Sequence, residues 1–273
     1  MTVGDVRNSD EVGLESWSDT LLKWTAEYAV YAIGFLSFFV LWHICSVYLI
    51  KSVLFPPPIP VLQKAVVLIG NGELFEHVGA SLQRILGGFV LGSFIGVLVG
   101  LLMGSFKFMR QLLDPYVETL RFIPAVAMIT VAVIWFGIGE ASKVFIITYS
   151  TVFIVVVTTA AGVSNIAPNK LRAAKSLGAS RAQIFFFVTL PATVPFILTG
   201  MRVAMANAFT TIVAAELVAA NTGVGTMLWN ARLFMLVENI FVALLALAIL
   251  GFTIDRVFRW AIRTFAGRYS PVG

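Results

Sequence analysis

Long apolar stretches without a single Asp, Glu, Lys or Arg dominate this sequence. Four of them, 28–50, 85–106, 122–139 and 144–163, are at least 18 residues long. A helix needs about 20 mostly apolar residues to cross the hydrocarbon core of a bilayer. Two further stretches, 193–218 and 236–254, reach the same length but contain charged residues. The sequence therefore predicts an all-α integral membrane protein with about six transmembrane helices.

The composition argues against several other classes of protein. Of the 273 residues 59% are hydrophobic and 12% are charged, about half the charged share of an ordinary soluble domain. The net charge of +5 is spread over the loops between apolar stretches, which gives little support to nucleic-acid binding. Cys45 has no second cysteine to pair with, and His43 and His77 are too few for a zinc or haem site. We therefore expect no metal and no cofactor on this chain, and membrane lipid as its surroundings.

The distribution of basic residues predicts the orientation in the membrane. With the N-terminus in the cytoplasm, 13 Lys and Arg residues fall on the cytoplasmic side and five on the outer side. Because cytoplasmic loops carry the basic excess in membrane proteins, both termini are expected in the cytoplasm. The expected parts are an acidic N-terminal tail (1–27), unlike a signal peptide, a transmembrane domain (28–260) and a C-terminal tail (261–273).

Glycine recurs at every fourth position of the second predicted span, at Gly88, Gly92, Gly96, Gly100 and Gly104. Such a ridge lets another helix approach closely, because no side chain holds the two backbones apart. The pattern predicts helix packing, either inside one subunit or at a subunit interface or moving seam.

Polar residues inside the predicted spans are candidates for a translocation path. Thr148, Thr151 and Thr158 gather on one side of the fourth span, although such hydroxyls also bond the carbonyls of their own helix. Arg202 lies deep in the fifth span, where a charge at the bilayer centre costs about 2.5 to 3.5 kcal/mol. Glu216 is roughly 21 Å further along the same helix and cannot pair with it. Arg202 is expected to face either an anion-accepting cavity or a partner on another span, and Glu216 completes the candidate path.

The loop 164–191 between the fourth and fifth spans carries four basic residues and no acid. Its composition predicts one or two short helices in which charged residues alternate with apolar ones. Such a helix suits either a groove in a partner protein or the membrane surface. A second turn-rich segment, 221–226, suits a re-entrant packing element.

The order of residues in the loop resembles the EAA loop of ABC importer permeases. In that family E-A-A is followed at fixed distances by Gly and by I-x-L-P. Here the matching residues are Arg172-Ala173-Ala174, Gly178 and Val188-x-Leu190-Pro191. Arg172 replaces the family's glutamate, which affects the usual acidic contact with the ATPase, and Val188 replaces isoleucine conservatively.

Further stretches look like the nitrate, sulfonate, taurine and bicarbonate branch of that family. The resemblance runs from about Pro56 to the last span. The stretches are Leu74-x-x-His77, Ser81-Leu82-x-Arg84, Leu120-Arg121-x-Ile123-Pro124, Trp135-Phe136-Gly137-Ile138-Gly139-Glu140-x-Ser142-Lys143, Gly200-x-Arg202 and Ala215-Glu216.

The resemblance implies a type I ABC importer fold in a bacterial inner membrane, with several partners. These are two cytosolic ATPase subunits that hold ATP and Mg, a second permease subunit, expected to form a homodimer, and an external solute-binding protein. The solute would be a small anion such as nitrate, a sulfonate such as taurine, or bicarbonate. By the same resemblance the segment 221–226 would help to form an outer gate that meets the binding protein, with the packing element as the alternative. A helix over 169–178 would seat in the ATPase, and the coupling residues implied are Lys170, Arg172, Ala173, Ala174, Lys175, Gly178, Arg181, Leu190 and Pro191.

This chain is not expected to be an enzyme. It contains no G-x-x-x-x-G-K-[ST] sequence to cradle a nucleotide phosphate, so ATP hydrolysis would belong to a partner. A secondary transporter or channel remains the alternative. Such proteins use membrane-embedded acids, and the four uncharged predicted spans contain no Asp or Glu. A membrane enzyme would need paired carboxylates or an activated nucleophile, and the sequence suggests neither.

Overall fold

A computed structural model describes residues 29, 31, 33, 34 and 36–266. Helices account for most of these residues, and no strand occurs among them, which confirms the all-α prediction. The chain divides into two units, Met1–Val61 and Leu62–Gly273. The predicted N-terminal tail (1–27) and residues 267–273 of the predicted C-terminal tail lie outside the described part.

The first unit contains an apolar helix over Leu36–Ile50, inside the first predicted span. It ends in a π-helical turn, η1 (Cys45–Ile50), where Lys51 adopts a left-handed conformation with φ of 48°. The Trp42 indole donates to the Pro56 carbonyl at 3.0 Å, and the Ser46 hydroxyl donates to the Phe55 carbonyl at 2.6 Å. These two bonds tie the proline-rich segment back to the helix that precedes it.

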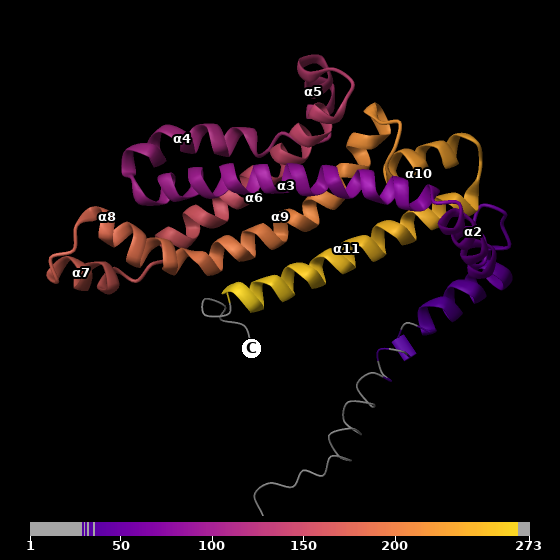
Figure 1. Cartoon of the computed structure of the whole chain (residues 1–273), viewed down its shortest axis with the longest axis horizontal. Coiled ribbons are helices and arrows are strands. Elements are labelled where there is room, and N and C mark those ends of the chain that lie inside the picture. The colour runs from indigo at the N-terminus through magenta and orange to yellow at the C-terminus, as the bar shows by residue number, and fades with distance from the viewer. Residues whose placement is uncertain (1–28, 30, 32, 35, 267–273) are drawn as a thin grey trace, which may run out of the picture. The chain divides into compact units, whose positions relative to one another are not determined.

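Four long helices form the second unit after α2 (Pro58–Gly70). They are α3 (Glu73–Ser105), α6 (Glu140–Ser164), α9 (Leu190–Ala219) and α11 (Val237–Ala266), and they lie roughly along one direction (Figure 1). Each contains a stretch long and apolar enough to cross a membrane. Shorter helices join them: α4 (Lys107–Leu120), α5 (Met128–Phe136), α7 (Pro168–Ser176), α8 (Arg181–Ile184), the π-helical η2 (Phe185–Thr189) and α10 (Val224–Leu233).

The core of this unit lies where α6 packs between α3 and α9. Apolar side chains that are nearly or completely buried come from all three helices because each turns one apolar face inward. They are Ile85 and Phe89 on α3, Ile147 and Val155 on α6, and Ala204, Met205, Ala208 and Ile212 on α9.

The glycine ridge of α3 lies directly against α6 within the same chain. A Cβ atom added at any of the five glycines would stand 2.5 to 2.7 Å from a Cβ atom of α6, closer than real Cβ contacts. The pairs are Gly88 with Ile147, Gly92 with Thr151, Gly96 with Val155, Gly100 with Thr159 and Gly104 with Val163. Because both numbers rise together, α3 and α6 run parallel.

Gly96→Ala should destabilise the fold by about 1 to 3 kcal/mol, the usual cost of overpacking a tight interface. The new methyl group would meet the Val155 side chain and, at 2.9 Å, the Val152 carbonyl oxygen, which cannot move aside cheaply. Thermal unfolding of the purified chain in detergent measures the loss. The control is Gly79→Ala on the same helix, where a Cβ meets nothing within 4 Å and alanine favours the helix. Equal losses in the two variants would contradict close packing as the role of the ridge.

The prediction of one span-long helix over 122–139 is wrong. The helical part, α5, has nine residues and a length of about 14 Å, less than half the hydrocarbon thickness. Pro124 has no backbone N–H to continue a helix, and Gly137 breaks the other end with φ of 75°. Since α3 and α6 run parallel, the return between them is made by α4, the turn 121–127 and α5 together (Figure 1).

Candidate functional site

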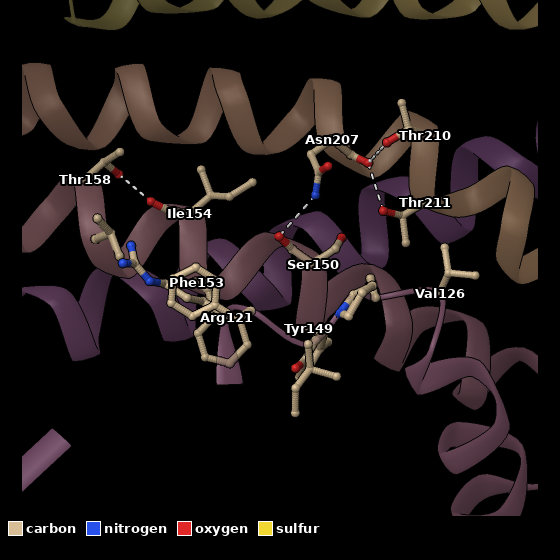
Figure 2. Close-up of a pocket in the computed structure, with 15 residues that line it drawn as sticks. Arg121, Val126, Tyr149, Ser150, Phe153, Ile154, Thr158, Asn207, Thr210 and Thr211 are labelled. Carbon is tan, nitrogen blue, oxygen red and sulfur yellow. Dashed lines mark hydrogen bonds between the residues drawn. The ribbon is translucent and has the colours of Figure 1, made fainter. Parts of the chain in front are cut away.

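A cavity of about 720 Å³ lies between α6, α9 and the turn 121–127. Figure 2 shows Tyr149, Ser150 and Phe153 on α6 and Asn207 on α9 around it. The wall is mostly apolar with a few polar groups, a composition typical of sites for small molecules. The turn reaches the cavity because Pro124 interrupts the helix there and leaves 121–127 as irregular backbone beside α6.

The polar groups of the cavity are held by hydrogen bonds between and within the two helices. The Asn207 amide donates to the Ser150 carbonyl at 3.3 Å and so spans the gap from α9 to α6 (Figure 2). The hydroxyls of Thr210 and Thr211 donate to the Asn207 backbone carbonyl at 2.8 and 2.9 Å. These bonds fix where a polar solute could find partners.

Arg121 is the one charged residue that lines the cavity, among the described residues. Its Nη2 bonds Glu118 at 2.6 Å on the neighbouring turn, and its guanidinium stands over the Phe122 ring at 4.9 Å from the centroid. The Tyr149 hydroxyl donates to the Leu120 carbonyl at 2.6 Å, which holds the end of α4 against α6. An arginine in the same wall as hydroxyl and amide groups is a combination that suits an anion.

An ion cluster around Arg84, here called the Arg84 cluster, joins four elements at one end of the unit; all its charged members are buried except Glu140, which is 63% exposed. The Arg84 side chain is 5% exposed and bonds both oxygens of Glu140, through Nε at 2.6 Å and Nη2 at 2.8 Å. Its Nη1 bonds Glu216 at 2.7 Å and the Thr222 carbonyl at 2.6 Å. Lys143 adds a second cation on Glu140 at 2.9 Å. The cluster therefore ties α3, α6 and α9 to the turn before α10.

Glu216 is the most enclosed member of the Arg84 cluster, with its side chain fully buried. Beyond Arg84, its carboxylate accepts from the Ser81 hydroxyl at 2.8 Å and from the Gly225 N–H at 2.8 Å. A Cβ on Gly223 would collide with this carboxylate, so the turn 221–226 can lie over Glu216 only with glycine there. A buried charge with this many partners is the arrangement that offsets its desolvation. The segment predicted as gate or packing element is thus packed onto the ion cluster.

The residues predicted to line a path fall in different places in the fold. Thr151 is buried under Gly92, the Thr148 hydroxyl donates to the Gly88 carbonyl at 3.3 Å, and Glu216 is enclosed by its partners. None of these three lines the cavity, because the glycine ridge of α3 covers their side of α6 and α10 covers Glu216. Thr158 does line the cavity, with its hydroxyl donating to the Ile154 carbonyl at 2.8 Å.

Arg202 also lies away from the cavity. Its Nε donates to Asp255 of α11 at 2.9 Å, so it has the partner on another helix that the sequence left as one of two possibilities. The partner was missed because the sixth predicted span ended at Ile254, whereas α11 continues to Ala266. Arg84 with Glu216 was missed for a different reason: both charges were visible, but nothing in the sequence states which pairs meet.

The basic loop forms two exposed helices. Lys170, Arg172, Ala173 and Lys175 are exposed on α7, and Arg181 begins α8. Gly178 has φ of 76°, donates to the Lys175 carbonyl at 2.9 Å and lets Ala179 donate to the Ala174 carbonyl at 3.1 Å. This pair of bonds is a Schellman motif, which glycine favours because it enters the left-handed region without strain.

The chain then turns sharply back toward the long helices. Ser180 and Gln183 cap α8 reciprocally, with backbone-to-side-chain bonds of 2.8 and 3.3 Å. A hollow of about 310 Å³ opens beside the turn, lined by Leu177, Gly178, Ala179, Gln183, Phe187 and Val188. Leu177 is 88% exposed there, an apolar group available to a partner. Leu190 and Pro191 open α9, where a missing proline N–H costs nothing.

The loop therefore joins the two helices that line the cavity. Three residues separate the end of α6 from α7, and η2 passes directly into α9. Figure 1 shows α7 and α8 together at the end of the unit opposite α5 and α10. A force on α7 would reach both walls of the cavity through short connections.

Comparison with known proteins gives consistent matches over most of the chain. The family of binding-protein-dependent transport system inner membrane components matches residues 92–270. A probable ABC transporter permease protein of Brucella melitensis is 42% identical, covering 78% of this chain and 86% of its own. The taurine transport system permease protein TauC of Escherichia coli is 36% identical, covering 84% of each. The nitrate import permease protein NrtB of Synechocystis is 33% identical, covering 74% and 76%.

A solved structure supports the same fold. The permease matched in an inward-facing MetNI methionine ABC transporter superposes with a TM-score of 0.53 at 20% identity, covering 67% of this chain and 93% of that one. At this identity the likeness concerns the fold alone.

Proposed function

Because the chain belongs to the family of binding-protein-dependent transport system inner membrane components, we propose that its cavity between α6 and α9 forms part of the path of a small anion. The chain is a permease subunit of an ABC importer and a multi-pass inner-membrane protein. One observation carries the mechanism: the helices that line the cavity are the two that the α7–α8 loop connects. The ATP-independent alternative is tested by uptake without ATPase.

Permeases of this family work with ATPase subunits and a solute-binding protein. For this chain the proposed assembly holds two ATPases, with ATP and Mg on them, and a second copy of the permease. Among the described residues, the cavity is lined by α6, α9 and the turn 121–127 alone, and a second copy would supply the other half of a closed path. The proposed orientation has both termini and α7 in the cytoplasm, as the count of basic residues favours.

The proposed coupling uses α7 as the contact with an ATPase. When ATP draws the two ATPases together, the two α7 helices move with them, and α6 and α9 tilt because they are joined to the loop. A ligand shifts a conformational equilibrium only through different contacts with its two states, and the ATP-bound pair would supply that difference. Because α7 carries three basic residues and no acid, the groove that receives it is expected to be acidic. This differs from the acidic contact that the family's glutamate makes at the position where this chain has Arg172.

An anionic solute fits the charge of the cavity. Arg121 is its one charged lining residue in the described chain, and Asn207, Thr210 and Thr211 add amide and hydroxyl groups elsewhere on the wall. The relatives named for taurine and nitrate transport suggest the same class of solute. Bicarbonate belongs to this class by charge, and the binding protein would select among them.

The proposed function is tested by uptake into vesicles that contain this chain with its cognate ATPase and binding protein. In these vesicles the lumen represents the cytoplasm. Uptake of taurine or nitrate should require ATP in the lumen, and an ion gradient alone should drive no uptake. Arg121→Gln should lower the apparent affinity of uptake about tenfold or more, because a hydrogen bond to a charged group is lost. The control Arg110→Gln removes an exposed arginine of α4 that lines no part of the cavity. Gradient-driven uptake without ATPase, or equal behaviour of the two variants, would contradict the proposal.

A further inference from the structure

A second charged group of residues lies between α9 and α11, away from the cavity. Asp255 bonds Arg202 at 2.9 Å and Arg259 at 2.7 Å. Arg256, the next residue in the chain, stacks over Phe252 at 5.0 Å from the ring centroid. Three arginines around one aspartate leave a formal surplus of two positive charges. The helices therefore present an uncompensated basic cluster, called here the Asp255 cluster.

The arginines of the Asp255 cluster have donors left to offer. Arg202 and Arg259 are 49% and 33% exposed, and each is seen with one bond to Asp255, whereas a guanidinium carries five N–H groups. The Arg259 Nε is buried with no hydrogen-bond partner in the described part of the chain. A buried donor without a partner is costly, so this part of the cluster gains from any rearrangement that gives the Nε an acceptor.

An apolar pocket of about 230 Å³ adjoins these charges. Arg202 and Asp255 are its polar lining residues, and the apolar ones are Met205, Ala206, Phe209, Gly251 and Phe258. Phe209 and Gly251 lie about 10 and 6 Å along their helices from the two charged residues, both in the direction of the membrane interior. Gly251 leaves this part of the wall open, since a Cβ there would make only an ordinary contact with the Phe209 ring at 3.9 Å, and a longer side chain would extend into the pocket.

The depth of the Asp255 cluster matches a membrane surface. Asp255 is 17 residues after Glu238, so the two lie about 26 Å apart along α11, close to the thickness of the hydrocarbon core. Trp260, 63% exposed one turn further on, is a residue type enriched at the membrane interface. Figure 1 shows this end of α11 directed toward the end of the unit that carries α7 and α8.

We propose that the Asp255 cluster and this pocket bind an anionic phospholipid, with its phosphate on Arg202 and Arg259 and part of an acyl chain beside Gly251. Charge complementarity selects the headgroup, because basic pockets between membrane helices attract acidic lipids. The apolar wall that extends from the charges toward the membrane interior, with Phe209 and Gly251, selects a lipid over a free anion. The lining residues of α9 here and those at the cavity lie on different faces of the helix, so the lipid does not occupy the transport path. Its assignment to the cytoplasmic leaflet rests on the orientation proposed above; the binding itself does not.

The test is retention of lipid by the purified full chain in native mass spectrometry, with phosphatidylglycerol, phosphatidylcholine and inorganic phosphate as separate probes. Phosphatidylglycerol should be retained in preference to phosphatidylcholine. Each arginine lost near a membrane surface weakens such binding about fivefold, so the double variant Arg202→Gln with Arg259→Gln should bind about 25-fold more weakly. The matched double variant Lys107→Gln with Arg110→Gln removes two exposed basic residues elsewhere and should change little.

Gly251→Leu tests the acyl pocket without changing any charge. It should weaken retention of phosphatidylglycerol severalfold and leave the binding of inorganic phosphate unchanged. If the double arginine variant does not fold, this variant alone tests whether the site binds a lipid. Equal retention of the two lipids, or unchanged binding by the double variant, would overturn the proposal. So would a Gly251→Leu chain that binds phosphatidylglycerol like the parent, since the site would then hold only an anion. None of these results depends on ATP-driven uptake, so they are separate from the proposed function.

Discussion

Gly178→Val is expected to abolish ATP-driven uptake while the chain still inserts into the membrane. Gly178 has φ of 76°, and a residue with a Cβ pays about 1 to 2 kcal/mol or more in that region, most of all when it is β-branched. A Cβ at this position meets nothing within 4 Å, so the variant harms the turn and not the packing. Losing the Schellman bonds would change the angle between α7 and the following helix α8. The contact of α7 with the ATPase would then be lost.

The matched control for this experiment is Gly178→Asn. Asparagine enters the left-handed region far more readily than valine, so most of the coupled uptake should return. ATP hydrolysis and uptake are measured in the same vesicles, together with the amount of ATPase that co-purifies with the permease. Normal coupling in the valine variant, or equal loss in both variants, would show that the turn at Gly178 does not position α7.

Glu216→Ala should lower the free energy of unfolding by about 3 to 5 kcal/mol, the usual result of removing one partner of a buried ion pair. The change leaves the Ser81 hydroxyl and the Gly225 N–H without their acceptor and deprives Arg84 of one of two carboxylates. The turn 221–226 would also lose the group on which it lies. Thermal unfolding in detergent and accessibility of that turn to protease measure the two effects.

Two comparisons separate the buried ion pair from a general effect of losing charge. Glu76→Ala removes an exposed carboxylate from the first turn of α3 and should change stability by less than about 0.5 kcal/mol. The double variant Arg84→Leu with Glu216→Leu should be less harmful than the sum of its parts, because an apolar pair avoids an unpaired buried charge. Additive losses in the double variant would contradict the direct pairing of Arg84 with Glu216.

Local chemistry was enough to predict several parts of this protein. Uncharged stretches of about 20 residues predict helices in the bilayer, since backbone groups in lipid must bond within their own segment. The basic loop was predicted to be helical with an end at Gly178, and α7 ends at Ser176 with Gly178 in the left-handed turn that follows. Each of these features depends on neighbours in sequence, whose physical preferences can be read residue by residue.

Hydrophobicity alone was misleading over 122–139. The stretch is as apolar as the other predicted spans, but Pro124 and Gly137 interrupt its backbone, and the resulting turn became a wall of the cavity. Composition measures the preference of side chains for lipid and does not weigh the backbone breaks that end a helix.

The length and order of the apolar segments, with the motif in the basic loop, already identified a membrane permease. The folded chain was needed to learn that Arg84 meets Glu216 across 132 residues, that Arg202 meets Asp255, and that the threonines of α6 divide between a packed seam and a cavity. Period and spacing place a residue on one face of its own helix, but they do not say which helix covers that face. That choice depends on how α3, α6, α9 and α11 pack together, and it is made by contacts between residues distant in sequence.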